Sequence, residues 1–260
     1  MMTPSLPQNT FVVETGNPDA RTALVLHGGG GPQTVAPIVG HLAETMHVLA
    51  PTHPGWNGSS RPDDIASVAQ LATAYLENLL ERGEHDVVLI GSSIGGWIAL
   101  EMAIQSAADE RYAGLIGTVI DIDGVGAVVE GEPGADFFAL DAHQLAEAAW
   151  HNPKLGYRDP AAFTDEQRAI QQSNGQTMAA IAGRTMSDAT LLERLGAITA
   201  PTLVVFGASD RIVTPAYGQA VARAIPGAEF AVVADAGHLP HLEAPEATWA
   251  VIDPFVKGIR

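Results

Sequence analysis

Cysteine is absent from the 260-residue chain, so disulfide bonds and thiol-based catalysis are excluded. Basic residues are also scarce. There are 13 Lys and Arg against 30 Asp and Glu, which gives a formal net charge of −17 at pH 7. Such a charge repels polyanions and anionic membrane surfaces. We therefore expect neither nucleic acid nor a membrane as a partner.

Long apolar runs are missing as well. No stretch reaches the roughly 18 uninterrupted apolar residues that mark a transmembrane helix. Residues 1–10, MMTPSLPQNT, have neither the basic start nor the apolar run of a secretory signal, so we expect a cytoplasmic protein. None of the nine histidines lies in an H-E-x-x-H or comparable ligand pattern, and we expect no metal and no cofactor.

Apolar sequence arranged for burial is abundant, at 47% of the chain. The length suits one α/β domain that carries an insertion. Apolar, β-prone segments alternate with segments of helical spacing. This alternation predicts an α/β fold with a mostly parallel central sheet flanked by helices on both faces. The predicted strands are 10–14, 23–26, 48–50, 86–90, 115–120, 202–206 and 229–234. The predicted helices are 35–46, 65–79 with Asp64 as its cap, 97–103, 189–195, 215–224 and 245–257.

The stretch 86–103, DVVLIGSSIGGWIALEMA, joins one such strand directly to a helix. A chain that turns straight from strand to helix strains the residue at the apex and needs nearly side-chain-free neighbours. Ser93 stands at that apex, with Gly91 and Gly95 two residues to either side. This is the G-x-S-x-G nucleophile elbow in its required context. Ser93 is the candidate nucleophile, and the Ile94 N–H at the helix N-terminus is a candidate oxyanion donor.

Other interpretations of this stretch are weaker. Ser92 would need glycine at positions 90 and 94, and both are isoleucine. A dinucleotide fingerprint would have glycine in place of Ser93 and a carboxylate on a second strand about 20 residues later. Asp109 and Glu110 fall instead at the end of the helix. A simple tight turn remains the plain alternative.

Residues 27–31, HGGGG, follow the strand 23–26. Consecutive glycines let a backbone approach a ligand closely and present its N–H groups. The loop is not a phosphate-binding P-loop, because the Lys and Ser/Thr of that motif are missing. We expect His27 to anchor this loop rather than to act as a base. His241 is interpreted as a structural hydrogen-bonding residue, and Asp235 as part of a turn.

Three side chains follow core strands in the order Ser93, Asp210, His238. A serine hydroxyl needs a base to become a good nucleophile, imidazole supplies one near neutral pH, and a carboxylate holds the imidazole tautomer. Loops at the C-terminal ends of parallel strands share one edge of the sheet, so these residues are expected to converge. Asp121 and Asp123 also follow a core strand and are alternatives for the acid.

Residues 126–187 break the alternation of strands and helices. They contain helical segments at 140–150, 163–172 and 176–182 and no convincing strand. An insertion of this kind between two core strands predicts a helical cap over the active-site mouth, with 1–125 and 188–260 as the core. Phe137, Trp150 and Met178 of the cap, with Trp56 of the turn 55–60, are candidate substrate-binding residues. The alternative is that the cap residues only hold the cap together.

These motifs together resemble the α/β-hydrolase superfamily, in the capped form that includes many bacterial esterases and the serine C–C bond hydrolases. The resemblance covers nearly the whole chain: HGGGG at 27–31, PGWNGSS at 54–60, GSSIGG at 91–96, GASDRIVTP at 207–215 and AGHLPHLEAPE at 236–246. It implies Ser93 as nucleophile, His238 as base and then acid, and Asp210 as its orienting partner. The second oxyanion donor would be the Gly29 N–H, with Gly28 and Gly30 as alternatives.

Two departures from the family pattern are visible. Only one clear strand precedes residue 23, and His53 stands where the family usually has Asp before Pro-Gly, which concerns the anchoring of a loop. A serine at the elbow argues against dehalogenases and epoxide hydrolases. The resemblance implies a cofactor-free serine hydrolase that cleaves a small neutral or apolar carboxylic ester through an acyl-enzyme. The alternatives are a C–C bond hydrolase of vinylogous diketone acids and a non-catalytic ligand-binding protein of this fold.

Overall fold

A computed structural model of the protein describes residues 4–7, 10 and 13–258. Within these residues a seven-stranded sheet has the strand order β1-β3-β2-β4-β5-β8-β9. Strand β1 is antiparallel to β3, and every other neighbouring pair is parallel. The predicted α/β fold with a mostly parallel sheet is therefore confirmed. The strands are β1 Val13–Gly16, β2 Thr22–Leu26, β3 His47–Ala50, β4 Val87–Ser92, β5 Ile116–Ile122, β8 Thr202–Gly207 and β9 Glu229–Val233.

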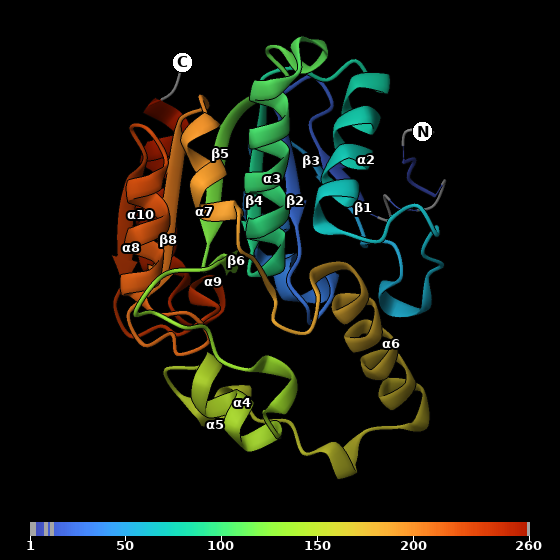
Figure 1. Cartoon of the computed structure of the whole chain (residues 1–260), viewed down its shortest axis with the longest axis vertical. Helices are drawn as coiled ribbons and strands as arrows, with labels where there is room; N and C mark the ends of the chain where they lie inside the picture. The colour runs from blue at the N-terminus through green and yellow to red at the C-terminus, as the bar shows by residue number, and fades with distance from the viewer. Residues whose placement is uncertain (1–3, 8–9, 11–12, 259–260) are drawn as a thin grey trace.

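Helices cover both faces of this sheet (Figure 1). Every residue of β2, β4 and β8 is buried, as expected of strands covered on both sides. Alternate residues of β2 enter different clusters: Leu24 and Leu26 pack with the α2 and α3 side, and Ala23 and Val25 with the α1 and α10 side. The core helices are α1 Ala36–Leu42, α2 Val68–Glu81, α3 Ile94–Ala108, α7 Leu191–Arg194, α8 Pro215–Ala224, α9 Pro240–Glu243 and α10 Pro245–Gly258.

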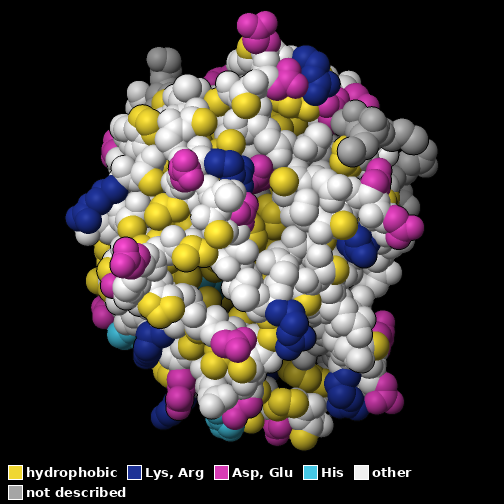
Figure 2. Space-filling view, in the orientation of Figure 1, with side chains coloured by type: hydrophobic (Ala, Val, Ile, Leu, Met, Phe, Trp, Pro, Cys, Tyr) yellow, Lys and Arg dark blue, Asp and Glu magenta, His cyan; other side chains and the backbone are white. Residues whose placement is uncertain are grey.

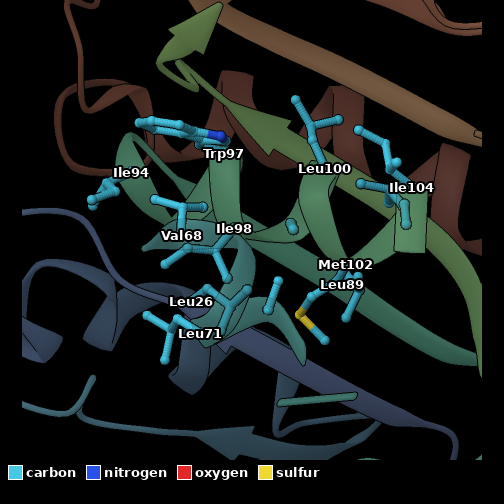
Figure 3. Close-up of a cluster of buried hydrophobic side chains, with 14 of the residues drawn as sticks. Leu26, Val68, Leu71, Leu89, Ile94, Trp97, Ile98, Leu100, Met102 and Ile104 are labelled. Carbon is cyan, nitrogen blue, oxygen red and sulfur yellow. The ribbon is translucent and has the colours of Figure 1, made fainter. Parts of the chain in front are cut away.

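Helix α3 is the centre of the larger cluster. Figure 3 shows Trp97 and Ile98 of α3 with Val68 and Leu71 of α2 and Leu26 of β2, and all of these side chains are buried. A helix this apolar along most of its length must be covered on most sides. Its N-terminus is thereby fixed beside the end of β4, which is the position of the predicted nucleophile.

The start of α2 differs from the prediction. The helix begins at Val68, and its cap is Ser67, whose Oγ accepts the Gln70 N–H at 3.1 Å, rather than Asp64. Ile65 is nevertheless buried, because the turn before the helix folds against the core. Apolar spacing therefore extended the prediction by one turn beyond the true cap. Of the predicted strand 10–14, residues 11 and 12 lie outside the described part of the chain.

The segment between β5 and β8 forms a helical layer beside the C-terminal ends of the strands, shown below the sheet in Figure 1. It contains α4 Ala142–Ala149, α5 Pro153–Gly156 and α6 Asp165–Ala182. The prediction of two helices at 163–172 and 176–182 is wrong, because α6 runs through Gly175 without a break. A glycine inside a helix costs only about 1 kcal/mol relative to alanine, and the capping box of Thr164 with Gln167 supports the first turn.

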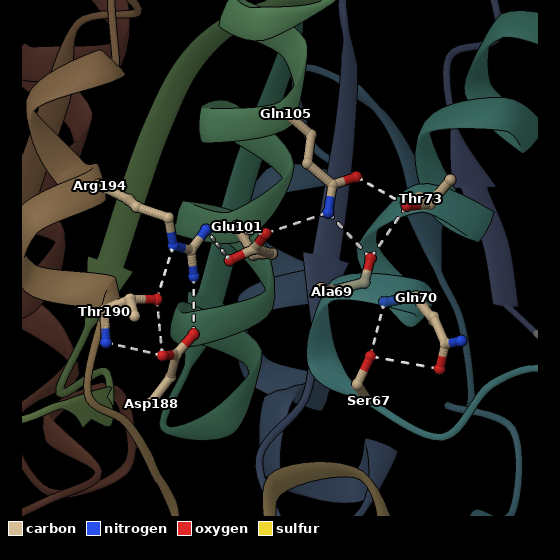
Figure 4. A network of polar contacts seen from close by, with 9 residues as sticks. All are labelled: Ser67, Ala69, Gln70, Thr73, Glu101, Gln105, Asp188, Thr190 and Arg194. Carbon is tan, nitrogen blue, oxygen red and sulfur yellow. Dashed lines mark hydrogen bonds and ion pairs between the residues drawn. The ribbon is translucent and has the colours of Figure 1, made fainter.

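Two short strands stand at the roots of this layer, although the sequence indicated none. Strands β6 Gly126–Ala127 and β7 Ser187–Asp188 pair in parallel and bring the two ends of the segment together. Figure 4 shows how β7 is tied to α3: Arg194 bridges the buried Glu101 and Asp188, at 2.8 Å to each. Of the helices among the described residues, none is both long enough and apolar enough to cross a membrane.

Candidate active site

Ser93 lies at the sharp turn between β4 and α3, with φ +59° and ψ −121°. A positive φ is strained for a residue with a side chain, and such strain persists only where the surroundings enforce it. Here the flanking glycines allow it. A Cβ at Gly91 would overlap the Gly95 carbonyl, and one at Gly95 would overlap the Leu26 carbonyl. The predicted turn and its requirement for small neighbours are thus both present.

His238 and Asp210 meet across the ends of two neighbouring strands. His238 Nδ1 donates to Asp210 Oδ2 at 2.7 Å, and both side chains are buried. Asp210 Oδ1 accepts the N–H groups of Ile212 at 2.8 Å and Val213 at 3.4 Å. The bond through Nδ1 leaves Nε2 of His238 as the nitrogen that can take a proton. Ser93 and His238 both line one cavity of about 870 Å³.

The glycine loop after β2 passes directly over Ser93. A Cβ added to Gly28 would lie 3.2 Å from the Ser93 Cβ. The carbonyl of Gly28 accepts His27 Nδ1 at 2.7 Å, and that of Gly29 accepts Trp56 Nε1 at 3.0 Å. Because N–H and C=O of one trans peptide point in opposite directions, the Gly29 and Gly30 N–H groups point away from these anchors. Ile94 is the first residue of α3, where an N–H has no acceptor within the helix.

A buried set of neutral side chains holds this loop. His53 Nε2 donates to the His27 carbonyl at 3.0 Å, and the His53 N–H donates to His27 Nε2 at 3.0 Å. The Tyr75 hydroxyl donates to His53 Nδ1 at 2.6 Å. Burial lowers the pKa of His27 to about 4 and lowers that of His53 as well. The histidine at position 53 therefore anchors the loop, and His27 does so too rather than facing the cavity.

Two further carboxyl groups lie beneath the site. Asp123 belongs to one cluster with Asp210 and His238, in which one ligand-type atom from each lies within 4.8 Å of the others. Burial and then the Asp210 charge raise the pKa of Asp123 well above its ordinary value. Asp121 packs where a Cβ on Gly96 or Gly124 would overlap it, and burial raises its pKa to about 7. Of the three candidate acids, Asp210 is the one bonded to His238.

The cavity is walled mainly by apolar side chains from the cap segment and the strand ends. Of the four predicted substrate-binding residues, Phe137, Trp150 and Met178 line this cavity. Trp56 is fully buried behind the glycine loop and is not part of the wall. Several other lining residues were not predicted from the sequence. Only those adjacent in sequence to Asp210 and His238 could have been expected there, because of their position. The missed side chains include Val125, Val129, Leu145, Arg184, Ile212, Val213, Tyr217 and Leu239.

The surface on the side shown in Figure 2 carries scattered charges of both signs, and no basic patch gathers there. The cavity wall itself has one cationic side chain among the described residues, Arg184, and two acidic ones, Glu132 and Asp136. Glu132 Oε2 accepts the Thr214 hydroxyl at 2.5 Å. The geometry therefore combines a mainly apolar cavity, a serine in its wall and an oriented imidazole.

Comparison with known proteins places this arrangement among relatives. The model of the Alpha/beta hydrolase family matches residues 23–251. The chain is 25% identical over 245 residues to Lipase 1 of Psychrobacter immobilis, covering 90% of this chain and 76% of that protein. It is 28% identical over 267 residues to 3-oxoadipate enol-lactonase 1 of Acinetobacter baylyi, covering 96% and 94%.

Solved structures show the same fold. The enol-lactonase from Burkholderia xenovorans LB400 superposes with a TM-score of 0.74 at 20% sequence identity, covering 94% of this chain and 95% of that one. With the family model spanning most of the sequence, from β2 to α10, the chain belongs to the alpha/beta hydrolase family and is a hydrolase.

Proposed function

We propose that the protein is a serine hydrolase that cleaves small neutral or apolar carboxylic esters through an acyl-enzyme, with Ser93, His238 and Asp210 as its triad. One observation carries the proposal. His238 is oriented by Asp210 through a buried 2.7 Å bond, and it shares a cavity with a strained serine at a helix N-terminus. The names of the two relatives support ester chemistry, since lipases cleave esters and a lactone is a cyclic ester.

The chemistry follows from these positions. His238 Nε2 takes the Ser93 hydroxyl proton as the oxygen attacks the substrate carbonyl, and Asp210 stabilises the resulting imidazolium. The N–H groups of Ile94 and Gly29 stabilise the negative oxygen of the tetrahedral intermediate. The imidazolium then protonates the departing alcohol, which leaves an acyl group on Ser93. Water, activated by the same imidazole, releases the acid and regenerates the serine.

The cavity wall supports an uncharged substrate. Most of its side chains are apolar, so burial of acyl or alcohol carbon atoms is favourable. Within the described wall, the charge of Arg184 is outnumbered by Glu132 and Asp136. A substrate with a free carboxylate would therefore meet net repulsion near the mouth. This consideration favours esters over the diketone acids that C–C bond hydrolases cleave.

The test is burst kinetics with short-chain p-nitrophenyl esters, together with labelling by a fluorophosphonate and mass spectrometry of the labelled peptide. Wild type should show a burst and carry the label on Ser93, and Ser93→Ala should lose both. Ser92→Ala is the matched control, because Ser92 is the adjacent buried serine and lies outside the cavity wall. A panel of lactones and a vinylogous diketone acid tests substrate class.

Full activity in Ser93→Ala would contradict the mechanism. A folded wild-type protein that does not label would indicate a binding protein. Faster turnover of the diketone acid than of any ester would indicate C–C bond cleavage instead.

A further inference from the structure

Asp123 is a buried carboxyl group that the proposed mechanism leaves unused. It follows the C-terminal end of β5 with φ +47°, a strained value for a non-glycine residue. Its Oδ1 accepts the Gly207 N–H at 2.9 Å, and its own N–H donates to the Val205 carbonyl at 2.9 Å. Asp123 is thus fastened to the end of β8, from which the loop carrying Asp210 departs.

The other oxygen of Asp123 is the unusual feature. Oδ2 is buried and has no hydrogen-bond partner among the described residues when the group is taken as a carboxylate. An ionised oxygen in that state would be strongly unfavourable. The Asp123 carboxyl has an oxygen within 4.8 Å of both an Asp210 carboxylate oxygen and a His238 ring nitrogen.

Two buried carboxyl groups this close do not both hold a negative charge. Asp210 accepts three hydrogen bonds, from Ile212, Val213 and His238, whereas Asp123 accepts one from Gly207. The charge is therefore better stabilised on Asp210, and the proton stays on Asp123. A protonated Oδ2 is a hydrogen-bond donor, and the Asp210 carboxylate is the neighbouring acceptor. In this protonation state Oδ2 is no longer without a partner. The side-chain hydrogen bond to Asp210 contributes to the raised pKa of Asp123.

We propose that Asp123 is a reserve acid of the triad: a protonated carboxyl that donates to Asp210 in the normal enzyme, and that becomes the carboxylate supporting His238 when Asp210 loses its charge. This role rests on the proposed serine mechanism. In the normal enzyme Asp123 is a positioning residue, which acts on His238 through Asp210. Its proton stays in place throughout the cycle, so the buried set Asp123, Asp210 and imidazolium is neutral when His238 is protonated.

Replacement of Asp210 reverses the balance. With Asn at position 210, the neighbouring negative charge that acts together with burial to keep Asp123 protonated is gone, so ionising Asp123 costs less free energy. The Asp123 proton is then lost to solvent on ionisation, and the carboxylate lies within 4.8 Å of the His238 ring in the wild-type geometry. At that separation it stabilises the imidazolium electrostatically without needing the same hydrogen bond.

The experiment is a double-mutant cycle on kcat/KM for a p-nitrophenyl ester, with Asp123→Asn and Asp210→Asn alone and together. Asn at 123 keeps an oxygen for the Gly207 N–H and an amide donor, but cannot ionise. In the wild-type background we expect Asp123→Asn to cost about threefold, the effect of one weakened hydrogen bond. Asp210→Asn should cost about 10²-fold, less than the roughly 10⁴-fold loss seen for an unsupported triad. In the Asp210→Asn variant, adding Asp123→Asn should lower kcat/KM by roughly a further tenfold or more, because the effects of the two residues are coupled.

Infrared difference spectra give a second measurement. A purely structural role of Asp123 predicts no change in its protonation when Asp210 is replaced. The carbonyl band of a protonated carboxyl should disappear in Asp123→Asn, and also in Asp210→Asn, where Asp123 ionises. The Asp210→Asn spectrum keeps the test available if Asp123→Asn does not fold. An equal loss for Asp123→Asn in both backgrounds, or a protonated Asp123 band that survives in Asp210→Asn, would overturn the proposal. Ser93→Ala, assayed in parallel, separates this result from a failure of the serine mechanism.

Discussion

Glu243 offers the sharpest test of how the helical segment between β5 and β8 is joined to His238, the proposed catalytic base. This half-buried carboxylate, in α9, accepts three backbone N–H groups: His151 at 2.9 Å and Asn152 at 3.0 Å from the cap segment, and Gly237 at 2.8 Å from the loop that carries His238. The Glu243 side chain therefore links residues 151–152 to the loop that carries His238, and Glu243→Ala should make the His238 ring less firmly positioned.

The magnitude can be worked from these contacts. A hydrogen bond to a charged group contributes about 1.5–3 kcal/mol, and partial exposure here favours the lower end. Three such bonds would sum to several kcal/mol, but water replaces part of them in the variant. The Ala149 carbonyl still accepts the His238 N–H at 2.7 Å, which preserves a second link. We therefore expect a loss of about 2–3 kcal/mol in unfolding free energy and a fall in kcat/KM of roughly 10- to 100-fold.

The assay is steady-state kinetics on a p-nitrophenyl ester combined with urea unfolding. Glu243→Gln should fall between wild type and Glu243→Ala, because the amide keeps one acceptor oxygen. Glu246→Ala is the control, since Glu246 is an exposed acidic residue three positions later, in the first turn of α10. The reasoning is refuted if Glu243→Ala and Glu246→Ala have kcat/KM values that agree within experimental error.

Two further predictions concern buried groups around the site. Trp56→Phe removes the donor to the Gly29 carbonyl and so loosens the Gly29–Gly30 peptide, which adjoins the Gly29 N–H. We therefore expect kcat to fall about tenfold with little change in KM, as for a displaced oxyanion donor. Trp249→Phe, which alters a ring stacked on His41 at 3.8 Å, is the control, and equal kcat in both variants would contradict the role of Trp56. Asp121→Asn tests the raised pKa of about 7. Between pH 3.8 and 7 the folded state holds a proton that the unfolded state has released, so this group makes stability fall as pH rises, by about 1.4 kcal/mol per unit. Urea unfolding at pH 5 and pH 8 should show that the unfolding free energy of the variant rises relative to that of wild type at pH 8. An unfolding free-energy difference that is the same at both pH values would contradict the raised pKa of Asp121.

Much of the site was predictable from sequence because its signals are local. The elbow glycines are required by the turn itself, since a Cβ at either position would overlap backbone. Buried parallel strands are near-continuous apolar runs, and the order of Ser93, Asp210 and His238 relative to them follows from the chain. Cap helices were harder to delimit, because Gly175 is a local signal for a break that the rest of α6 overrides.

By itself, then, the sequence determined the strand alternation, the strained serine and the set of acids and histidines able to assist it. Only the tertiary structure decided among them, because hydrogen-bond partners and burial depend on residues far apart in the chain. It gave the hydrogen bond with His238 to Asp210 rather than to Asp121 or Asp123, and it turned Trp56 away from the cavity toward Gly29. It also placed Asp123 beside Asp210, although 87 residues separate them, which no spacing rule in the sequence can express.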